Sequence, residues 1–158
     1  MLFQPPNVSL LDVPHIQQKR DGECLAACAA MVLQYYGQPR RYWRLRNILK
    51  IRRNVGTPFS SIKNLERIGI SVAVQQYGTI EALYQATTLG WPVIASVQTG
   101  QLGYWDSDVR HAVVVVGLDP NSVYINDPQL ETGPRQVAIG DFDLAWLEHD
   151  ERYAILEP

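Results

Sequence analysis

The chain has 158 residues, of which 46% are hydrophobic and 19% are charged, a balance that is typical of globular proteins and excludes a largely disordered one. Its formal net charge of −2 gives no reason to expect nucleic acid or an anionic membrane as a partner. The first residues lack the pattern of a secretion signal and no stretch is long and apolar enough to span a bilayer, so we expect a cytoplasmic protein with one domain, residues 1–158.

The first half of the chain is predicted to be mainly helical. Prolines make residues 1–20 irregular, with an extended segment at residues 8–16. A run rich in alanine predicts a helix from Cys24 to Tyr36, because it is periodic and is followed by glycine and proline. Three more helices are expected within residues 41–51, 57–69 (with Ser60 or Ser61 near its N-cap and Gly69 after its end) and 79–90.

The second half changes from helical to extended patterns. Short runs rich in β-branched residues are separated by Gly, Pro, Asn and Asp, which is typical of strands joined by turns. Helices followed by an antiparallel sheet indicate an α+β fold, with the alanine-rich helix packed centrally against the sheet. The predicted strands cover residues 91–98, 111–118, 122–127, 135–139 and 152–157.

Both cysteines of the chain lie at the start of the alanine-rich helix. Backbone N–H groups in a first helical turn have no partner within the helix, and the helix dipole favours negative charge there. A thiol at this place ionises more readily, and the thiolate is the nucleophilic form. Cys24 occupies this position, whereas Cys28, one turn later, is interpreted as a small core residue. The alternative is that both cysteines only fill the core.

Three other residues are candidates for the groups that a thiolate nucleophile needs. Gln18 precedes Cys24 by six residues and could direct an amide N–H toward an oxyanion. His111 opens one predicted strand and Asp127 closes the next, so a hairpin would bring them to the same edge of the sheet. Simple pairing of the two strands about their turn places Asp127 two or three residues away from the position directly opposite His111. A contact between them therefore requires a diagonal arrangement or a β-bulge. The alternative is a structural histidine and an aspartate that caps a turn.

The combined pattern resembles the papain-like cysteine peptidases, and in detail the bacterial double-glycine leader peptidases that process bacteriocins, including stand-alone relatives. The resemblance covers most of residues 12–128 and is carried by VPHIQQKRDGECLAACAAMVLQYYG, GTPFSSIKNLERIGI, GWPVIASV and RHAVVVVGLDPNSVYINDP. It implies a papain-like fold with Cys24 as nucleophile, His111 as base, Asp127 as its orienting partner and Gln18 as oxyanion donor. It implies no cofactor and no metal.

The resemblance also implies a class of substrate, and this chain departs from the family pattern at one position. The expected substrate is a peptide or protein, such as a leader peptide with a glycine-rich cleavage site. The family usually has glycine after the nucleophile, whereas this chain has Leu25, whose side chain could narrow the approach to the sulfur. No transporter or nucleotide-binding segment accompanies the pattern, which indicates a stand-alone form rather than a transporter-fused one.

Several alternatives stay open from the sequence. The fold could serve as a catalytically weak module that binds peptides or proteins, or the triad could transfer an acyl group instead of hydrolysing it. A zinc site of Cys24, Cys28 and His111 is disfavoured because a second close pair of ligands is missing. Asn126 rivals Asp127 for the third catalytic role. The run at residues 40–53 has seven positive charges and no acid, which suits docking of an acidic partner or simply a solvated helix face.

Overall fold

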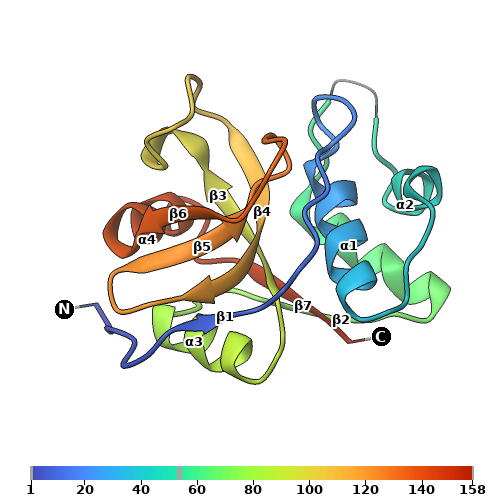
Figure 1. Cartoon of the computed structure of the whole chain (residues 1–158). Coiled ribbons are helices and arrows are strands. Elements are labelled where there is room, and N and C mark those ends of the chain that lie inside the picture. Colours follow the sequence, from blue (N-terminus) through green and yellow to red (C-terminus); the bar gives the residue numbers. More distant parts are fainter. Residues whose placement is uncertain (1, 53–54, 158) are drawn as a thin grey trace.

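A computed structural model describes residues 2–52 and 55–157 of the chain. Its centre is a seven-stranded antiparallel sheet with the order β2-β7-β3-β4-β5-β6, and β1 pairs with β4 (Figure 1). The strands are β1 Ser9–Leu10, β2 Ser71–Gln75, β3 Val93–Gln98, β4 Arg110–Leu118, β5 Ser122–Asn126, β6 Arg135–Ala138 and β7 Tyr153–Glu157. Arg53 of the basic run lies outside the described residues.

Helices cover both faces of the sheet. On β4, Ala112, Val114 and Val116 belong to one core cluster and Val113 and Val115 to a second, because side chains alternate along a strand. The first cluster includes residues of α1 Cys24–Tyr35, α2 Tyr42–Ile48 and the 3₁₀ helix η1 Phe59–Ile68, and the second includes residues of α3 Ile80–Thr88 and α4 Ile139–Leu147 (Figure 1). The α+β prediction is confirmed.

Helix α1 is the most deeply buried helix of the described residues. Every residue from Leu25 to Leu33 is buried, and the four alanines among them allow the helix to lie close to β4. The helix ends where Gly37 adopts a φ of 74°, a conformation that glycine tolerates without strain. The alanine-rich helix therefore occupies the central position that the sequence predicts.

The three other predicted helices all form, but the ends or the type of two of them differ from the prediction. Helix α3 begins after Thr79, whose Oγ1 accepts a hydrogen bond of 3.0 Å from the Ala82 N–H. The helix expected at 41–51 is shorter, because Arg41 is extended and Lys50 has a φ of 55°, which a right-handed helix cannot accommodate. The segment at 57–69 was predicted wrongly in part: it is a 3₁₀ helix that begins at Phe59 after Pro58, and no side chain caps its start.

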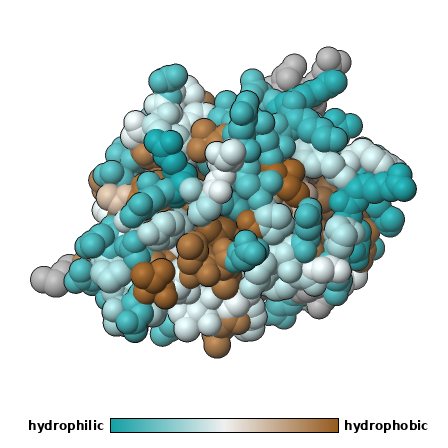
Figure 2. All heavy atoms as spheres, in the orientation of Figure 1, coloured by the Kyte–Doolittle hydropathy of each residue, from teal (hydrophilic) through white to brown (hydrophobic). Residues whose placement is uncertain are grey.

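The strand β2 and the helix α4 have no counterpart in the sequence prediction: β2 lies in the half that is expected to be mainly helical, and α4 follows the predicted strand at 135–139. The strand β1 lies within the segment at 8–16 that is expected to be extended. Helix α4 buries Phe142, Ala145 and Trp146 on the sheet. Figure 2 shows that the viewed face is mostly hydrophilic, with apolar side chains gathered near its centre. The short strand β1 contributes little burial, because Leu10 is 51% exposed.

Candidate active site

Cys24 is the first residue of α1 and is only partly buried. Its thiol therefore lies at the helix end where backbone N–H groups are free to face a ligand. Leu25 is 2% exposed and packs into the core cluster, and it also contributes to the lining of the cavity beside Cys24. Cys28 is fully buried, and this burial raises the pKa of its thiol well above the usual value, which keeps it protonated.

A β-bulge brings His111 and Asp127 to the same face of the sheet. After the turn, Leu118 pairs with Val123 and Gly117 with Tyr124, but the register then shifts, so that Val114 pairs with Asn126. Without the shift, Val114 would lie opposite Asp127, whose side chain would then point to the face away from His111. With it, Asp127 lies opposite Val113, two residues from His111 and on its face.

The His111 ring makes a short hydrogen bond to Asp127. Its Nε2 lies 2.6 Å from Asp127 Oδ1, and both side chains are buried. Cys24 lies near enough to the ring to raise the pKa of His111, and both residues line the same cavity. Asn126 points to the opposite face, where its Nδ2 donates to the Val13 carbonyl at 3.1 Å. The structure thus places Asp127, and not Asn126, beside His111.

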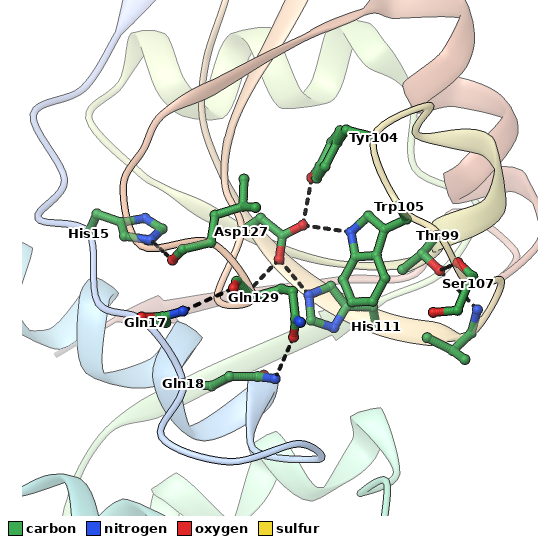
Figure 3. A network of polar contacts seen from close by, with 12 residues as sticks. His15, Gln17, Gln18, Thr99, Tyr104, Trp105, Ser107, His111, Asp127 and Gln129 are labelled. Carbon is green, nitrogen blue, oxygen red and sulfur yellow. Dashed lines mark hydrogen bonds and ion pairs between the residues drawn. The ribbon is translucent and has the colours of Figure 1, made fainter.

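Asp127 is completely buried and accepts four hydrogen bonds. Besides His111, the Gln129 N–H donates to Oδ1 at 2.9 Å, while Tyr104 Oη and Trp105 Nε1 donate to Oδ2 at 2.5 and 2.9 Å (Figure 3). Burial alone would raise the pKa of Asp127, but these donors and the charge of His111 lower it below its usual value. The side chain is therefore held as a carboxylate in a fixed orientation.

The protonation of His111 follows from the same contacts. Burial favours neutral imidazole and alone would lower the pKa of His111, but the hydrogen bonds to Asp127 and Cys24 and the charges of these two groups outweigh it. Together they raise the pKa of His111 to about 9. The indole of Trp105 lies edge-on to the imidazole with ring centroids 4.7 Å apart. At neutral pH the ring is therefore an imidazolium beside the Asp127 carboxylate.

Gln18 lies on the other side of the cleft from the strand residues. Its backbone N–H donates to the Pro128 carbonyl at 2.8 Å, and its side-chain Nε2 donates to Gln129 Oε1 at 3.0 Å (Figure 3). Gln18, Cys24 and His111 line one cavity of about 690 Å³. The four residues that the sequence predicts for the site are thus brought together, three of them around the cavity and Asp127 behind His111.

Glu23, directly before the thiol, is a buried carboxylate that the sequence prediction missed. Tyr42 Oη donates to its Oε1 at 3.0 Å, and Arg46 forms an ion pair with Oε2 at 3.1 Å. The same tyrosine oxygen accepts the Lys19 N–H at 3.3 Å. Helix α2 therefore anchors the loop that runs from Gln18 to Cys24, which gives part of the basic run a structural role.

Other supporting residues were also missed, because they lie in loops without periodic patterns. Tyr104 and Trp105 belong to the segment between η2 Thr99–Gln101 and β4, and Gln129 follows the turn after Asp127. Two aromatic residues next to each other in a polar loop were the only signal that the sequence offered for the first pair. For Glu23, the signal was an acidic residue at the start of an otherwise apolar helix.

The cavity continues along the surface beyond the thiol. A second hollow of about 660 Å³ shares Phe59, Ser96 and Arg110 with the first. Within residues 2–52 and 55–157, no group of three or more His, Cys, Asp or Glu side chains is arranged to hold a metal ion. In the same residues, no helix has the length and apolar character needed to cross a membrane.

The comparisons with known sequences identify relatives of this chain. Residues 12–149 match the model of the peptidase C39 family. The chain is also 26% identical over 131 residues to the lactococcin-G-processing and transport ATP-binding protein LagD of Lactococcus lactis subsp. lactis. That match covers 83% of this chain but only 17% of LagD, so the similarity concerns a small part of the transporter.

Solved structures show the same fold. A protein described as a C39-like peptidase of Bacillus anthracis has a TM-score of 0.77 at 21% identity, with 98% of both chains covered. A double-glycine motif protease from an AMS/PCAT transporter, solved in complex with the leader peptide, has a TM-score of 0.71 at 24% identity, with 99% of both chains covered. The fold that the sequence resemblance implied is confirmed.

Proposed function

Because this chain belongs to the peptidase C39 family and is therefore a cysteine-type peptidase of papain-like fold, we propose that it hydrolyses peptide bonds with Cys24 as the nucleophile. In this proposal His111 carries the proton, Asp127 orients His111, and Gln18 helps to stabilise the oxyanion. The observations that carry the proposal are the 2.6 Å contact of His111 with the Asp127 carboxylate and the cavity that Gln18, Cys24 and His111 line together.

The first half of the reaction forms an acyl-enzyme. The Cys24 thiolate attacks the peptide carbonyl carbon, and an S–C bond forms while the carbonyl oxygen becomes an oxyanion. The Gln18 amide and the N–H groups at the start of α1 stabilise this charge. When the C–N bond breaks, the His111 imidazolium gives its proton to the departing amine.

The second half releases the product and restores the enzyme. His111, now neutral, removes a proton from a water molecule, and the resulting hydroxide attacks the thioester carbon. The S–C bond breaks, the new carboxylic acid leaves, and the thiolate and imidazolium are formed again. Asp127 stays ionised throughout, because its role is to hold and stabilise the imidazolium.

The pH dependence of thiol alkylation tests this assignment. His111 stays protonated until the pH approaches about 9, so its positive charge should stabilise the Cys24 thiolate at neutral pH and below. We expect the rate of Cys24 alkylation by iodoacetamide to be high already at pH 6 and to change little up to pH 8, measured by mass spectrometry of the labelled peptide. Peptide hydrolysis should fall above about pH 9, as the imidazolium is lost.

His111→Ala is the matched control for this titration. In that variant the alkylation rate should rise with pH as for an ordinary thiol, whose pKa is about 8.5. If the unsubstituted protein already gave that ordinary profile, the catalytic assignment would be wrong and the alternative of a peptide-binding module would be favoured. The partial exposure of Cys24 beside the cavity supports the catalytic reading.

We further propose that the substrate is a peptide with small residues, such as a glycine pair, before the scissile bond. Leu25, Phe59 and Trp105 line the cavity that contains Cys24, and such apolar walls favour small residues next to the reacting carbonyl. The continuous second hollow offers room for further residues of an extended peptide. The leader peptide bound to the AMS/PCAT protease is consistent with this class of substrate.

An acidic segment of the substrate would find its complement on α2. Arg46 is used internally by Glu23, but Arg41, Arg44 and Lys50 are exposed, and the described part of the basic run contains no acidic residue. Figure 2 shows a hydrophilic surface on the side of the molecule where α2 lies. We therefore propose that this face attracts acidic residues of the peptide or protein substrate.

One peptide series tests both substrate preferences. Replacing a glycine pair before the scissile bond with two leucines should lower kcat/KM by about tenfold or more, since large side chains must enter a restricted site. Adding acidic residues far from that bond should lower KM at low salt, and Arg44→Glu or 0.5 M salt (about three times physiological ionic strength) should remove this benefit. Equal rates across the glycine and leucine peptides, or a salt-independent KM, would contradict the respective proposal.

A further inference from the structure

Gln129 occupies a place between two parts of the catalytic site. Its backbone N–H donates to Asp127 Oδ1 at 2.9 Å, and its side-chain Oε1 accepts a hydrogen bond of 3.0 Å from Gln18 Nε2 (Figure 3). We propose that Gln129 is a positioning residue that orients the Gln18 amide for oxyanion stabilisation. This inference rests on the proposed role of Gln18 as an oxyanion donor.

The Gln18 side chain depends on this contact. Its Oε1 is buried and makes no hydrogen bond within the described part of the chain, so the bond from Nε2 to Gln129 is what fixes the rotation of the amide group. An amide nitrogen carries two hydrogens. When Gln129 accepts one of them, the second hydrogen is left for the developing oxyanion.

The backbone of Pro128 and Gln129 also holds the Gln18 segment in place. Two more hydrogen bonds join the same two segments: the Gln18 N–H donates to the Pro128 carbonyl at 2.8 Å, and Gln17 Nε2 donates to the Gln129 carbonyl at 3.1 Å. Both end on backbone carbonyls and do not involve the Gln129 side chain. A change of that side chain therefore removes the contact with the Gln18 amide while the backbone contacts, including that to Asp127, are retained.

The Gln129→Leu variant tests the inference, because leucine has a similar volume and no acceptor. We expect kcat for a peptide ester to fall about tenfold with little change in KM, a smaller loss than the roughly hundredfold cost of removing an oxyanion donor outright. Alkylation of Cys24 by iodoacetamide should proceed at the unaltered rate, because that substitution at carbon forms no oxyanion. Gln129 is exposed, so the variant is expected to fold normally, which thermal unfolding checks.

A double-substitution cycle with Gln18→Ala separates the possible failures. If Gln129 acts through Gln18, Gln129→Leu should cause no further loss in the Gln18→Ala background. Independent, multiplying losses would overturn the inference and leave the role of Gln18 intact, as would an unchanged kcat in Gln129→Leu alone. No effect of Gln18→Ala itself would overturn the proposed oxyanion role and this inference with it.

Gln17→Leu is the matched control. It removes a hydrogen bond between the same two segments but leaves the Gln18 amide contact in place. We expect its kcat to equal that of the unsubstituted protein. A loss in Gln17→Leu as large as that in Gln129→Leu would show that only the docking of the segments matters, and would overturn the inference.

Discussion

Replacing Cys24 with alanine is expected to abolish peptide hydrolysis while the fold is retained. The substitution removes the only partly exposed thiol in the described residues, and removal of a nucleophile from such a catalytic unit lowers kcat by about 10⁴-fold or more. Little packing is lost, because Cys24 lies at the edge of the core. The measurement is hydrolysis of a peptide substrate, with thermal unfolding followed in parallel to show that the protein is folded.

Cys28→Ala is the control for this experiment. Cys28 is fully buried in the core cluster, and burial keeps its thiol protonated, so its removal should cost stability and leave kcat nearly unchanged. Its alkylation by iodoacetamide should likewise be much slower than that of Cys24. Hydrolysis that persisted in Cys24→Ala and disappeared in Cys28→Ala would exchange the roles of the two residues.

Replacing Asp127 with alanine is expected to lower kcat by about a hundredfold or more with little change in substrate binding. The carboxylate fixes the His111 ring at 2.6 Å and helps to keep it charged. Without it, His111 is still present but is less well held and less readily protonated. The loss should therefore be smaller than that in His111→Ala, and kcat and KM measured separately would show it.

The Asp127→Asn variant is expected to be more harmful than its similar shape suggests. Tyr104 and Trp105 both donate hydrogen bonds to Oδ2, whereas an amide that keeps its oxygen toward His111 would turn an NH₂ group toward these two donors. The Trp105 indole N–H, which can only donate, would then face another donor in a buried place, which costs stability. We expect a lower melting temperature as well as slower turnover for this variant.

The Asn126→Ala variant decides whether Asn126 or Asp127 has the third catalytic role. Asn126 lies on the opposite face of β5 and bonds to Val13, so its removal should lower stability more than kcat. A larger fall in kcat for Asn126→Ala than for Asp127→Ala would contradict the assignment of the third role. No fall in either variant would indicate that Cys24 and His111 act as a pair without a third residue.

The sequence was sufficient to identify the candidate residues around the cavity, but not the strand register that brings Asp127 next to His111. Cys24, Gln18 and His111 could be found because a helix start and a strand start are visible in the pattern of apolar residues. The placement of Asp127 depends on the register shift between Val115 and Gly117. A glycine within a strand is a general signal for a bulge, but it does not give the register that follows. The catalytic roles of these residues stay predictions that the variants above test.

Other parts of the fold could not be predicted from the sequence for similar physical reasons. Helix α4 includes a glycine and two aspartates, which hide a helical spacing of Ile139, Phe142 and Trp146 that could have been recognised. The contacts of Tyr104 with Asp127 and of Gln129 with Gln18 join loops that are far apart in sequence or lack any period. Only the folded chain brings such partners together.

The position of the nucleophile early in the chain and of its partners much later has a consequence for biosynthesis. The N-terminal part of a chain leaves the ribosome first, so Cys24 emerges long before β4 and β5 can pair. Until they do, the thiol has neither His111 nor Asp127 beside it. The proposed catalytic site is therefore complete only after the sheet has closed.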